Sequence, residues 1–208
     1  MPPSELSALL LLATAASFTP GPNTTLSTAL AAGHGLRAAL AFVVAVPVGW
    51  TALLGLSMLG LGQAVASLPG VRAVVVGLGT AYLVWLAFRL WGSNQLSPLQ
   101  ATPPRVGFAE GVLLQFVNIK AWTLAWAVAA GWVVGRPDAL ARAGVVLPLM
   151  AAFGLASNLS YALVGSLLRN WLAGPLVEGV PSGLRLRVFN RVMAAALLAT
   201  ACWMVTHV

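Results

Sequence analysis

Two short stretches combine polar side chains with residues that can interrupt a helix, a pattern that can form a binding site for a small polar solute. The first is Thr19-Pro20-Gly21-Pro22-Asn23. Proline lacks a backbone N–H, and its ring clashes with the carbonyl four residues back, so the carbonyls of Ala16 and Phe18 lose their helical partners. Gly21 allows a neighbour or ligand to approach the backbone. A structural proline kink is the simpler alternative, but two prolines flanked by Thr and Asn favour a site.

The second stretch is Gln115-Phe116-Val117-Asn118-Ile119-Lys120, within the apolar run 108–134. Lys120 lies near the middle of that run, where a lysine costs about 2.5–3.5 kcal/mol on membrane-insertion scales. Either membrane interface is roughly 15 Å away along the helix, so the side chain cannot easily reach it. We therefore expect Lys120 to face the protein interior and bind a ligand. The alternative is a structural cation that binds carbonyls freed by the first break.

Other polar residues in apolar runs could extend this site. Asn158, next to Ser157, lies inside the fifth apolar run, and Asn190 lies near the start of the last one. An asparagine inside a membrane helix commonly bonds to a neighbouring helix, contributing roughly 1 kcal/mol. Asn158 is included among the candidate site residues with that structural role as its alternative. Trp122 and Trp126 share a helix face, where packing or lipid contact is favoured over lining a cavity.

The composition indicates that these residues sit in a membrane protein. Of the 208 residues, 60% are hydrophobic and only 7% are charged, against about 25% charged in a soluble domain. The net charge of +7 comes from arginines spread between apolar runs, which suits anchoring in an anionic lipid bilayer better than binding nucleic acid. One cysteine and two histidines are too few for a metal site, and we expect no cofactor.

Six apolar stretches are long enough to cross a bilayer, which takes roughly 20 residues. They are 6–30, 38–62, 70–92, 108–134, 144–168 and 189–207. Long Leu/Ala/Val runs without alternation exclude a β-barrel, and Glu5 before the first run argues against a cleaved signal peptide. We therefore predict one all-α integral membrane domain over residues 1–208.

The two motifs occupy corresponding places in this plan. The first motif interrupts the first helix of the leading three, and the second lies in the first helix of the following three. Three helices per half forces the halves into opposite orientations, and interrupted helices at matching positions of inverted repeats indicate a transport site near the membrane midplane. The sequence thus predicts a 3+3 inverted repeat with an interrupted first helix and a candidate interruption in the fourth.

Arginines in the connections predict the orientation. Arg37, Arg89, Arg105, Arg169, Arg185, Arg187 and Arg191 belong to the odd connections, whereas Arg72, Arg136 and Arg142 belong to the even ones. The positive-inside rule then places the odd connections in the cytoplasm and both termini outside. Small-xxx-small pairs such as Gly131 and Gly135 are too common to define an oligomer interface.

Both motifs resemble those of the LysE/RhtB amino-acid exporters. Thr19 to Asn23, followed by Gly35 and Arg37, is similar to the family's opening signature, and Gln115 to Lys120 is similar to its fourth-helix motif, usually written Asn-Pro-Lys. Residues 81–87, the region from Gly154 to Asn158 and the last helix also fit. The Gln-Phe-Val-Asn-x-Lys form looks most like the branch that exports cysteine and O-acetylserine.

The resemblance implies six helices, efflux of small amino acids or derivatives across the inner (cytoplasmic) membrane, and coupling to the proton gradient. It makes Pro20, Gly21, Pro22, Asn23, Asn118 and Lys120 the core motif residues. Asn23 stands where many relatives carry Asp, so no carboxylate titrates there. Ile119 replaces the usual proline, which weakens the expectation of a break in the fourth helix.

We expect alternating access around the two breaks. Half-helix N-termini and Lys120 would attract a substrate carboxylate, while Asn23, Asn118 and freed carbonyls would accept hydrogen bonds from its ammonium group. Lys120 is the only deeply placed group able to carry a proton. A passive small-solute channel is the nearest alternative. A membrane-embedded enzyme is a weaker one, because the acidic residues and histidines lie near helix ends or in loops.

Overall fold

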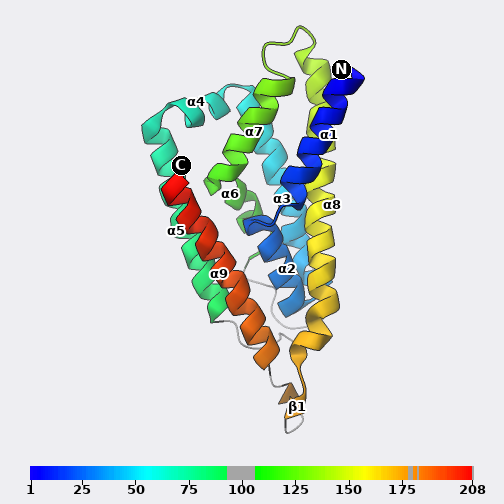
Figure 1. Ribbon diagram of the computed structural model, residues 1–208, viewed down its shortest axis with the longest axis vertical. Helices are drawn as coiled ribbons and strands as arrows, with labels where there is room; N and C mark the ends of the chain where they lie inside the picture. The colour runs from blue at the N-terminus through cyan, green and yellow to red at the C-terminus, as the bar shows by residue number, and fades with distance from the viewer. Residues whose placement is uncertain (93–105, 178–179, 182, 208) are drawn as a thin grey trace.

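The computed structural model describes residues 1–92, 106–177, 180–181 and 183–207, and the predicted loop around 93–105 lies outside this part of the chain. Within it the chain is helical apart from one hairpin of two two-residue strands (Figure 1). In order, the elements are α1 (Pro3–Phe18), α2 (Pro22–His34), α3 (Leu36–Met58), α4 (Leu61–Ser67), α5 (Pro69–Trp91), α6 (Phe108–Val117), α7 (Ile119–Trp132), α8 (Ala139–Ala173), β1 (Leu176–Val177), β2 (Val180–Pro181) and α9 (Leu184–His207).

The prediction of an all-α membrane protein is confirmed in its general form. Over the described residues, α3, α5, α8 and α9 are long and apolar enough to cross a membrane, and α6 with α7 makes a fifth candidate span bent by 71°. The first predicted segment, 6–30, is two helices, of which α1 is apolar but only 16 residues long. Over the described residues, length and composition alone thus support four or five spans, and the six predicted are not confirmed.

Several boundaries also differ from those predicted. The second segment, 38–62, ends early because Gly60 adopts a positive φ of 102°, which turns the chain into the short helix α4. The fifth segment, 144–168, is part of the 35-residue helix α8, which is five residues longer at each end. The last helix begins at Leu184 rather than 189.

Corresponding helices in the two halves of the chain run in opposite directions (Figure 1). In this view α1 and α2 run downward, α3 upward and α5 downward, whereas α6 and α7 run upward, α8 downward and α9 upward. The broken helices of each half pack against the other half: α2 packs on α8 of the second half, while α6 and α7 pack on α3 of the first. The remaining large contacts are α3 with α8 and α5 with α9.

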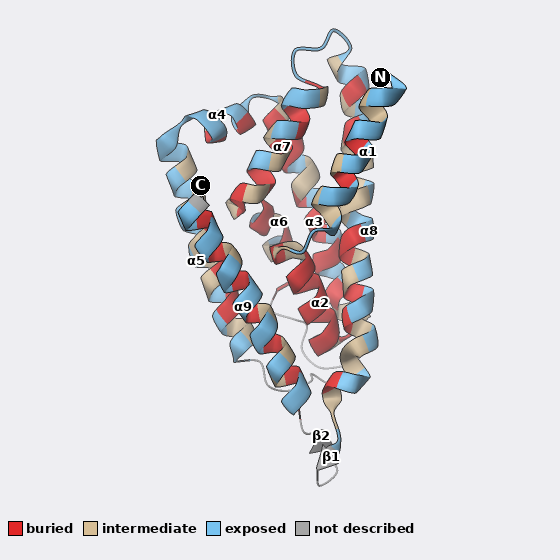
Figure 2. Ribbon diagram, in the orientation of Figure 1, coloured by how far each residue is buried: buried red, intermediate tan, exposed pale blue. Residues whose placement is uncertain are grey.

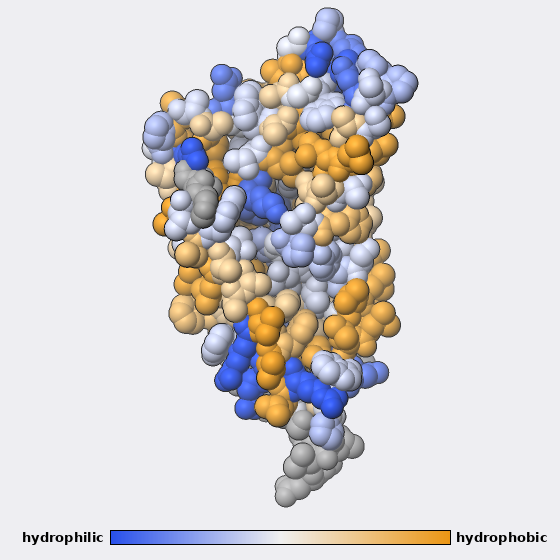
Figure 3. Space-filling model, viewed as in Figure 1, coloured by the Kyte–Doolittle hydropathy of each residue, from blue (hydrophilic) through white to orange (hydrophobic). Residues whose placement is uncertain are grey.

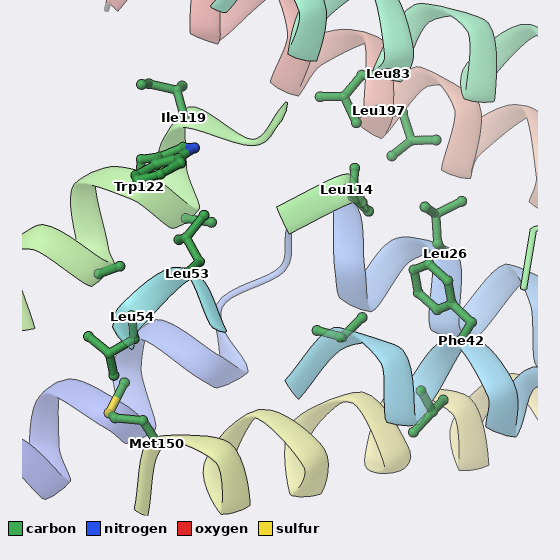
Figure 4. Packing of buried hydrophobic residues seen from close by; sticks show 14 of the residues in the cluster. Leu26, Phe42, Leu53, Leu54, Leu83, Leu114, Ile119, Trp122, Met150 and Leu197 are labelled. Carbon is green, nitrogen blue, oxygen red and sulfur yellow. The ribbon is translucent and has the colours of Figure 1, made fainter. Parts of the chain in front are cut away.

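The interior of the bundle lies around α2 and α3 (Figure 2). Nearly all of α2 is buried, whereas α5, α8 and α9 expose apolar side chains on their outer faces. Figure 4 shows how side chains such as Leu26, Phe42, Leu114 and Leu197 point toward one another from four different helices. Gly165 permits the contact of α8 with α2, because a β-carbon there would lie 2.2 Å from the Thr28 carbonyl oxygen.

The two ends of the bundle differ in charge. At the upper end of Figure 1, Arg142 bonds to Glu5 of α1 and, at 2.7 Å, to Asp138, which joins α1 to the start of α8. The hydrogen bond from Arg142 holds the pKa of the Asp138 carboxyl below its ordinary value. Among the described residues the lower end carries six arginines, at positions 37, 89, 169, 185, 187 and 191, and Arg105 lies outside the described part of the chain. Figure 3 shows hydrophilic surface at both ends and extensive apolar surface between them.

Candidate binding site at the two helix breaks

The first break lies between α1 and α2. Thr19 is extended, with φ −69° and ψ 127°, and Gly21 is fully extended, with φ −168° and ψ −174°. The Gly21 N–H donates to Thr24 Oγ1 at 2.9 Å, so the start of α2 provides its own acceptor. Pro22 occupies the first position of α2, where a proline loses no helical hydrogen bond.

The carbonyls at the end of α1 receive hydrogen bonds from α8. Ser157 Oγ donates to the Ser17 carbonyl, and Tyr161 donates through its hydroxyl to the Phe18 carbonyl at 3.0 Å. An unpaired carbonyl in a membrane interior costs several kcal/mol. The first break is therefore stabilised by a helix that follows it by about 140 residues.

The second break lies at Asn118, between α6 and α7, so the predicted interruption of the fourth segment is present without a proline. Asn118 is extended, with φ −95° and ψ 102°, and its Oδ1 accepts the Lys120 N–H at 3.1 Å as the N-cap of α7. Trp122 Nε1 donates to the Phe116 carbonyl at 2.8 Å, which satisfies a carbonyl at the end of α6. Trp122 thus has the packing and capping role rather than lining the cavity.

A cavity of about 90 Å³ lies between the two breaks. Seven of the eight predicted site residues line it: Thr19, Gly21, Pro22, Asn23, Asn118, Lys120 and Asn158. Pro20, the eighth, is not among the lining residues and contributes only to the break. In Figure 3 hydrophilic surface also lies in the middle of the face, between α9 and α1. The role of these residues in binding stays a prediction.

Lys120 brings an unpaired positive charge to this cavity. Among the described residues, no hydrogen bond or ion pair involves its ammonium group, although the side chain is half-buried. The group approaches the first break, since a β-carbon added at Gly21 would lie 3.8 Å from Lys120 Nζ. The sequence predicted that a neighbour or ligand approaches the backbone at Gly21, and in the structure this neighbour is the Lys120 side chain.

Asn23 is held by a residue that the sequence did not single out as a site residue. Its Nδ2 donates to Gln115 Oε1 at 3.0 Å, and Gln115 Nε2 donates to Asn23 Oδ1 at 3.1 Å. This reciprocal amide pair joins α2 to α6, and Gln115 is completely buried. Asn158 is also engaged, because it accepts from Ser27 Oγ at 2.9 Å and donates to the Gly154 carbonyl at 2.8 Å.

Several lining residues were missed at the level of sequence. Pro47 and Trp50 of α3, and Met150 and Gly154 of α8, complete the apolar part of the wall. Pro47 could have been found, because a proline inside a membrane helix frees a carbonyl at the same depth as the motifs. The others carry no such signal.

The cavity can bind groups of both charges. The N-termini of α2 and α7 meet there beside Lys120, and helix N-termini with an ammonium group favour an anion such as a carboxylate. Ala16 and Ser17, at the C-terminal end of α1, line another part of the wall and present the carbonyl end of a helix, which favours a cation. In the described residues no cluster of three or more His, Cys, Asp or Glu could hold a metal ion.

Helices long and apolar enough to cross a membrane, with a polar cavity at two interrupted helices, are typical of transporters. A family model described as LysE type translocator matches residues 14–207. The chain belongs to this family, and the predicted resemblance is confirmed.

Relatives with described functions point to amino-acid export. The chain is 29% identical over 168 residues to the cysteine/O-acetylserine efflux protein of Salmonella typhimurium, covering 80% of this chain and 85% of the relative. It is 29% identical over 188 residues to the protein of that name from Klebsiella pneumoniae, covering 85% and 95%. The Escherichia coli K12 protein of the same name is 30% identical over 169 residues, covering 80% and 85%. No solved structure matches the chain.

Proposed function

We propose that the protein exports small amino acids or their derivatives, of the cysteine and O-acetylserine type, across the cytoplasmic membrane. The observation that carries the proposal is the cavity between two broken helices, into which Lys120 brings an ammonium group with no partner in the described part of the chain. The names of the efflux relatives support the same class of cargo.

The cavity suits one small zwitterion. A bound zwitterion would place its carboxylate near Lys120 and the N-termini of α2 and α7, and its ammonium group near the C-terminal end of α1, all of which line the cavity. A cavity needs roughly 10–15 Å³ to hold one water molecule, so a volume of about 90 Å³ holds several waters or one small solute. The buried apolar neighbours Val46 and Met150 leave room for a short side chain.

Transport proceeds by alternating access between two inverted halves. The six spans are α1 with α2, then α3, α5, α6 with α7, α8 and α9. The opposite helix directions and the packing of the broken helices against the opposite half support a 3+3 inverted repeat. Each broken helix rests on the other half, so a movement of one half against the other changes the walls of the cavity.

The lower end of Figure 1 faces the cytoplasm. Six arginines lie at that end, whereas the upper end has three, two of which pair with Glu5 or Asp138. The positive-inside rule then orients the protein with its N-terminus outside, and this placement fits an inner-membrane exporter.

The proton gradient drives export, and Lys120 is the proton-carrying group. It is the one titratable side chain among the residues that line the cavity in the described part of the chain.

An export assay tests the proposal. Cells that overproduce the protein should accumulate O-acetylserine or cysteine outside against a gradient, and an uncoupler should abolish the accumulation. Hydrogen bonds to charged groups contribute about 1.5–3 kcal/mol, so Lys120→Met should lower export roughly 10- to 100-fold at equal expression, with a smaller loss for Lys120→Arg.

Arg72→Met, which removes a positive charge from the start of α5, is the matched control and should export normally. Undiminished export by Lys120→Met would contradict the role of Lys120. Export that only equalises concentrations and ignores the uncoupler would indicate a passive channel instead.

A further inference from the structure

The cavity carries one positive charge and no negative one among the described residues. Lys120 lines it, but none of the three described acidic side chains does. Glu5 and Asp138 are paired with arginines at the upper end, and Glu110 accepts the Gly107 N–H at 3.0 Å at the start of α6. The charge on Lys120 is therefore not balanced by a protein carboxylate at the site.

The polar group that the first break presents at this place is a neutral amide held in a fixed orientation. Both polar atoms of the Asn23 side chain are bonded to Gln115. Gln115 is itself fixed, because it is fully buried and its Nε2 also donates to the Gly111 carbonyl at 3.0 Å. Gly49 leaves it just enough room, since a β-carbon there would lie 2.9 Å from Gln115 Cγ.

We propose that Asn23, fixed by Gln115 opposite the unpaired Lys120, sets the charge selectivity of the site: the site takes solutes of net charge zero or −1 and rejects cationic ones such as lysine. This rests on the proposed function, because it defines which amino acids the exporter accepts. The C-terminal end of α1, whose dipole favours one cation, lines the site through Ala16 and Ser17, and no carboxylate among the described residues lines it to favour a second.

The physical basis is repulsion in a site of low dielectric constant. Two positive charges about 6 Å apart, at an effective dielectric constant of ~20, repel strongly enough to weaken binding roughly 100-fold. A cationic side chain in a cavity of about 90 Å³ cannot move far from Lys120. A carboxylate at position 23 would balance Lys120 and remove most of this repulsion.

Uptake into proteoliposomes of the purified full-length protein tests the proposal with three probes: O-acetyl-L-serine, L-aspartate and L-lysine. The wild type should prefer O-acetylserine over lysine by roughly 100-fold. Asn23→Asp should reduce that ratio at least about tenfold and weaken uptake of aspartate. Asn170→Asp adds the same charge on the exposed end of α8 and should leave the ratio unchanged.

A second variant is the control for misfolding of Asn23→Asp, in which the pair with Gln115 is lost. Thr19→Asp places a carboxylate on the same cavity at an exposed position without touching Gln115, and it should shift the ratio in the same direction. Wild-type uptake of lysine equal to that of O-acetylserine, or an unchanged ratio in both folded variants, would overturn the charge selection alone. Uptake of none of the three probes by the wild type would instead contradict the proposed function.

Discussion

The two helix breaks meet at one cavity, yet they are made by different means. At the first break, two prolines remove backbone donors, and the exposed carbonyls are satisfied from α8, a distant part of the chain. At the second, the side-chain hydrogen bonds seen in the described residues are local: the Asn118 side chain caps α7, and Trp122 bonds to a carbonyl six residues earlier. A helix can thus be interrupted because prolines remove backbone hydrogen-bond donors, or because side chains cap a new helix start. A proline in the sequence indicates only the first kind of break.

The breaks also contribute different chemistry. The first presents the carbonyl end of α1 together with the neutral amide of Asn23, whereas the second presents the ammonium group of Lys120. Each break therefore supplies the partner for one end of a zwitterion. The pair between Asn23 and Gln115 joins them into one unit.

Adding a methyl group at two close helix contacts, one at the second break and one between α8 and the middle of α2, should have the largest effect on stability. A β-carbon at Gly79 would lie 1.9 Å from the Val117 carbonyl oxygen at the second break, and one at Gly165 would lie 2.2 Å from that of Thr28 on α2. We expect Gly79→Ala and Gly165→Ala each to lower the free energy of unfolding by about 3 kcal/mol, measured by denaturation in detergent.

Gly77→Ala is the control for this pair, because nothing lies within 4 Å of a β-carbon there. If Gly79→Ala were as stable as Gly77→Ala, the contact between α5 and the second break would not support that break.

Removing the caps supplied by α8 should affect the first break next most strongly. The double variant Ser157→Ala with Tyr161→Phe leaves the carbonyls of Ser17 and Phe18 without these donors. An unsatisfied group costs about 1–3 kcal/mol when buried, and the bond from Tyr161 lies at an exposed position, so we expect a loss of about 2 kcal/mol in the same denaturation assay. Ser160→Ala, whose hydroxyl bonds within α8 on its exposed side, should change stability little. Equal effects of the double variant and the control would mean that water or lipid satisfies these carbonyls.

Adding a proline to the second break should have the smallest effect. Ile119 is the first residue of α7, where a proline removes no helical hydrogen bond, and the extended backbone of Asn118 is the conformation that precedes proline. Ile119 is almost fully buried, so we expect Ile119→Pro to cost about 1 kcal/mol through the smaller side chain and nothing through the backbone, whereas Ala125→Pro inside α7 should cost about 3 kcal/mol or more. A large loss for Ile119→Pro would show that α6 and α7 are continuous through Asn118.

The sequence indicated the local features of this site and missed those that depend on tertiary contacts. Residues 19–23 were found because proline and glycine act on their own backbone, and Lys120 because a charge inside an apolar run is conspicuous. The pair of Asn23 with Gln115 spans 92 residues and follows from helix packing, so no local pattern encodes it. The caps from Ser157 and Tyr161 were missed for the same reason.

The fold was likewise predictable where it depends on local sequence, and not where it depends on tertiary contacts. The helical class and the approximate positions of the apolar segments follow from composition and run length. The break at Asn118 was only weakly expected because Ile119 is not proline, and the full length of α8 was missed because its ends extend beyond the apolar window. Boundaries depend on tertiary contacts such as the ion pair of Arg142 with Glu5, which joins residues 137 apart.

The distance along the chain between the first break and its caps has a consequence for biosynthesis. Ser157 and Tyr161 are synthesised about 140 residues after the carbonyls that they cap, which at ~5–20 residues per second takes roughly 7–28 s. During that interval the break cannot rest in lipid without a cost of several kcal/mol per carbonyl. The nascent α1 and α2 must therefore stay beside water or the insertion machinery until α8 emerges. The hydrogen bonds that complete the first break then form only after α8 has been made.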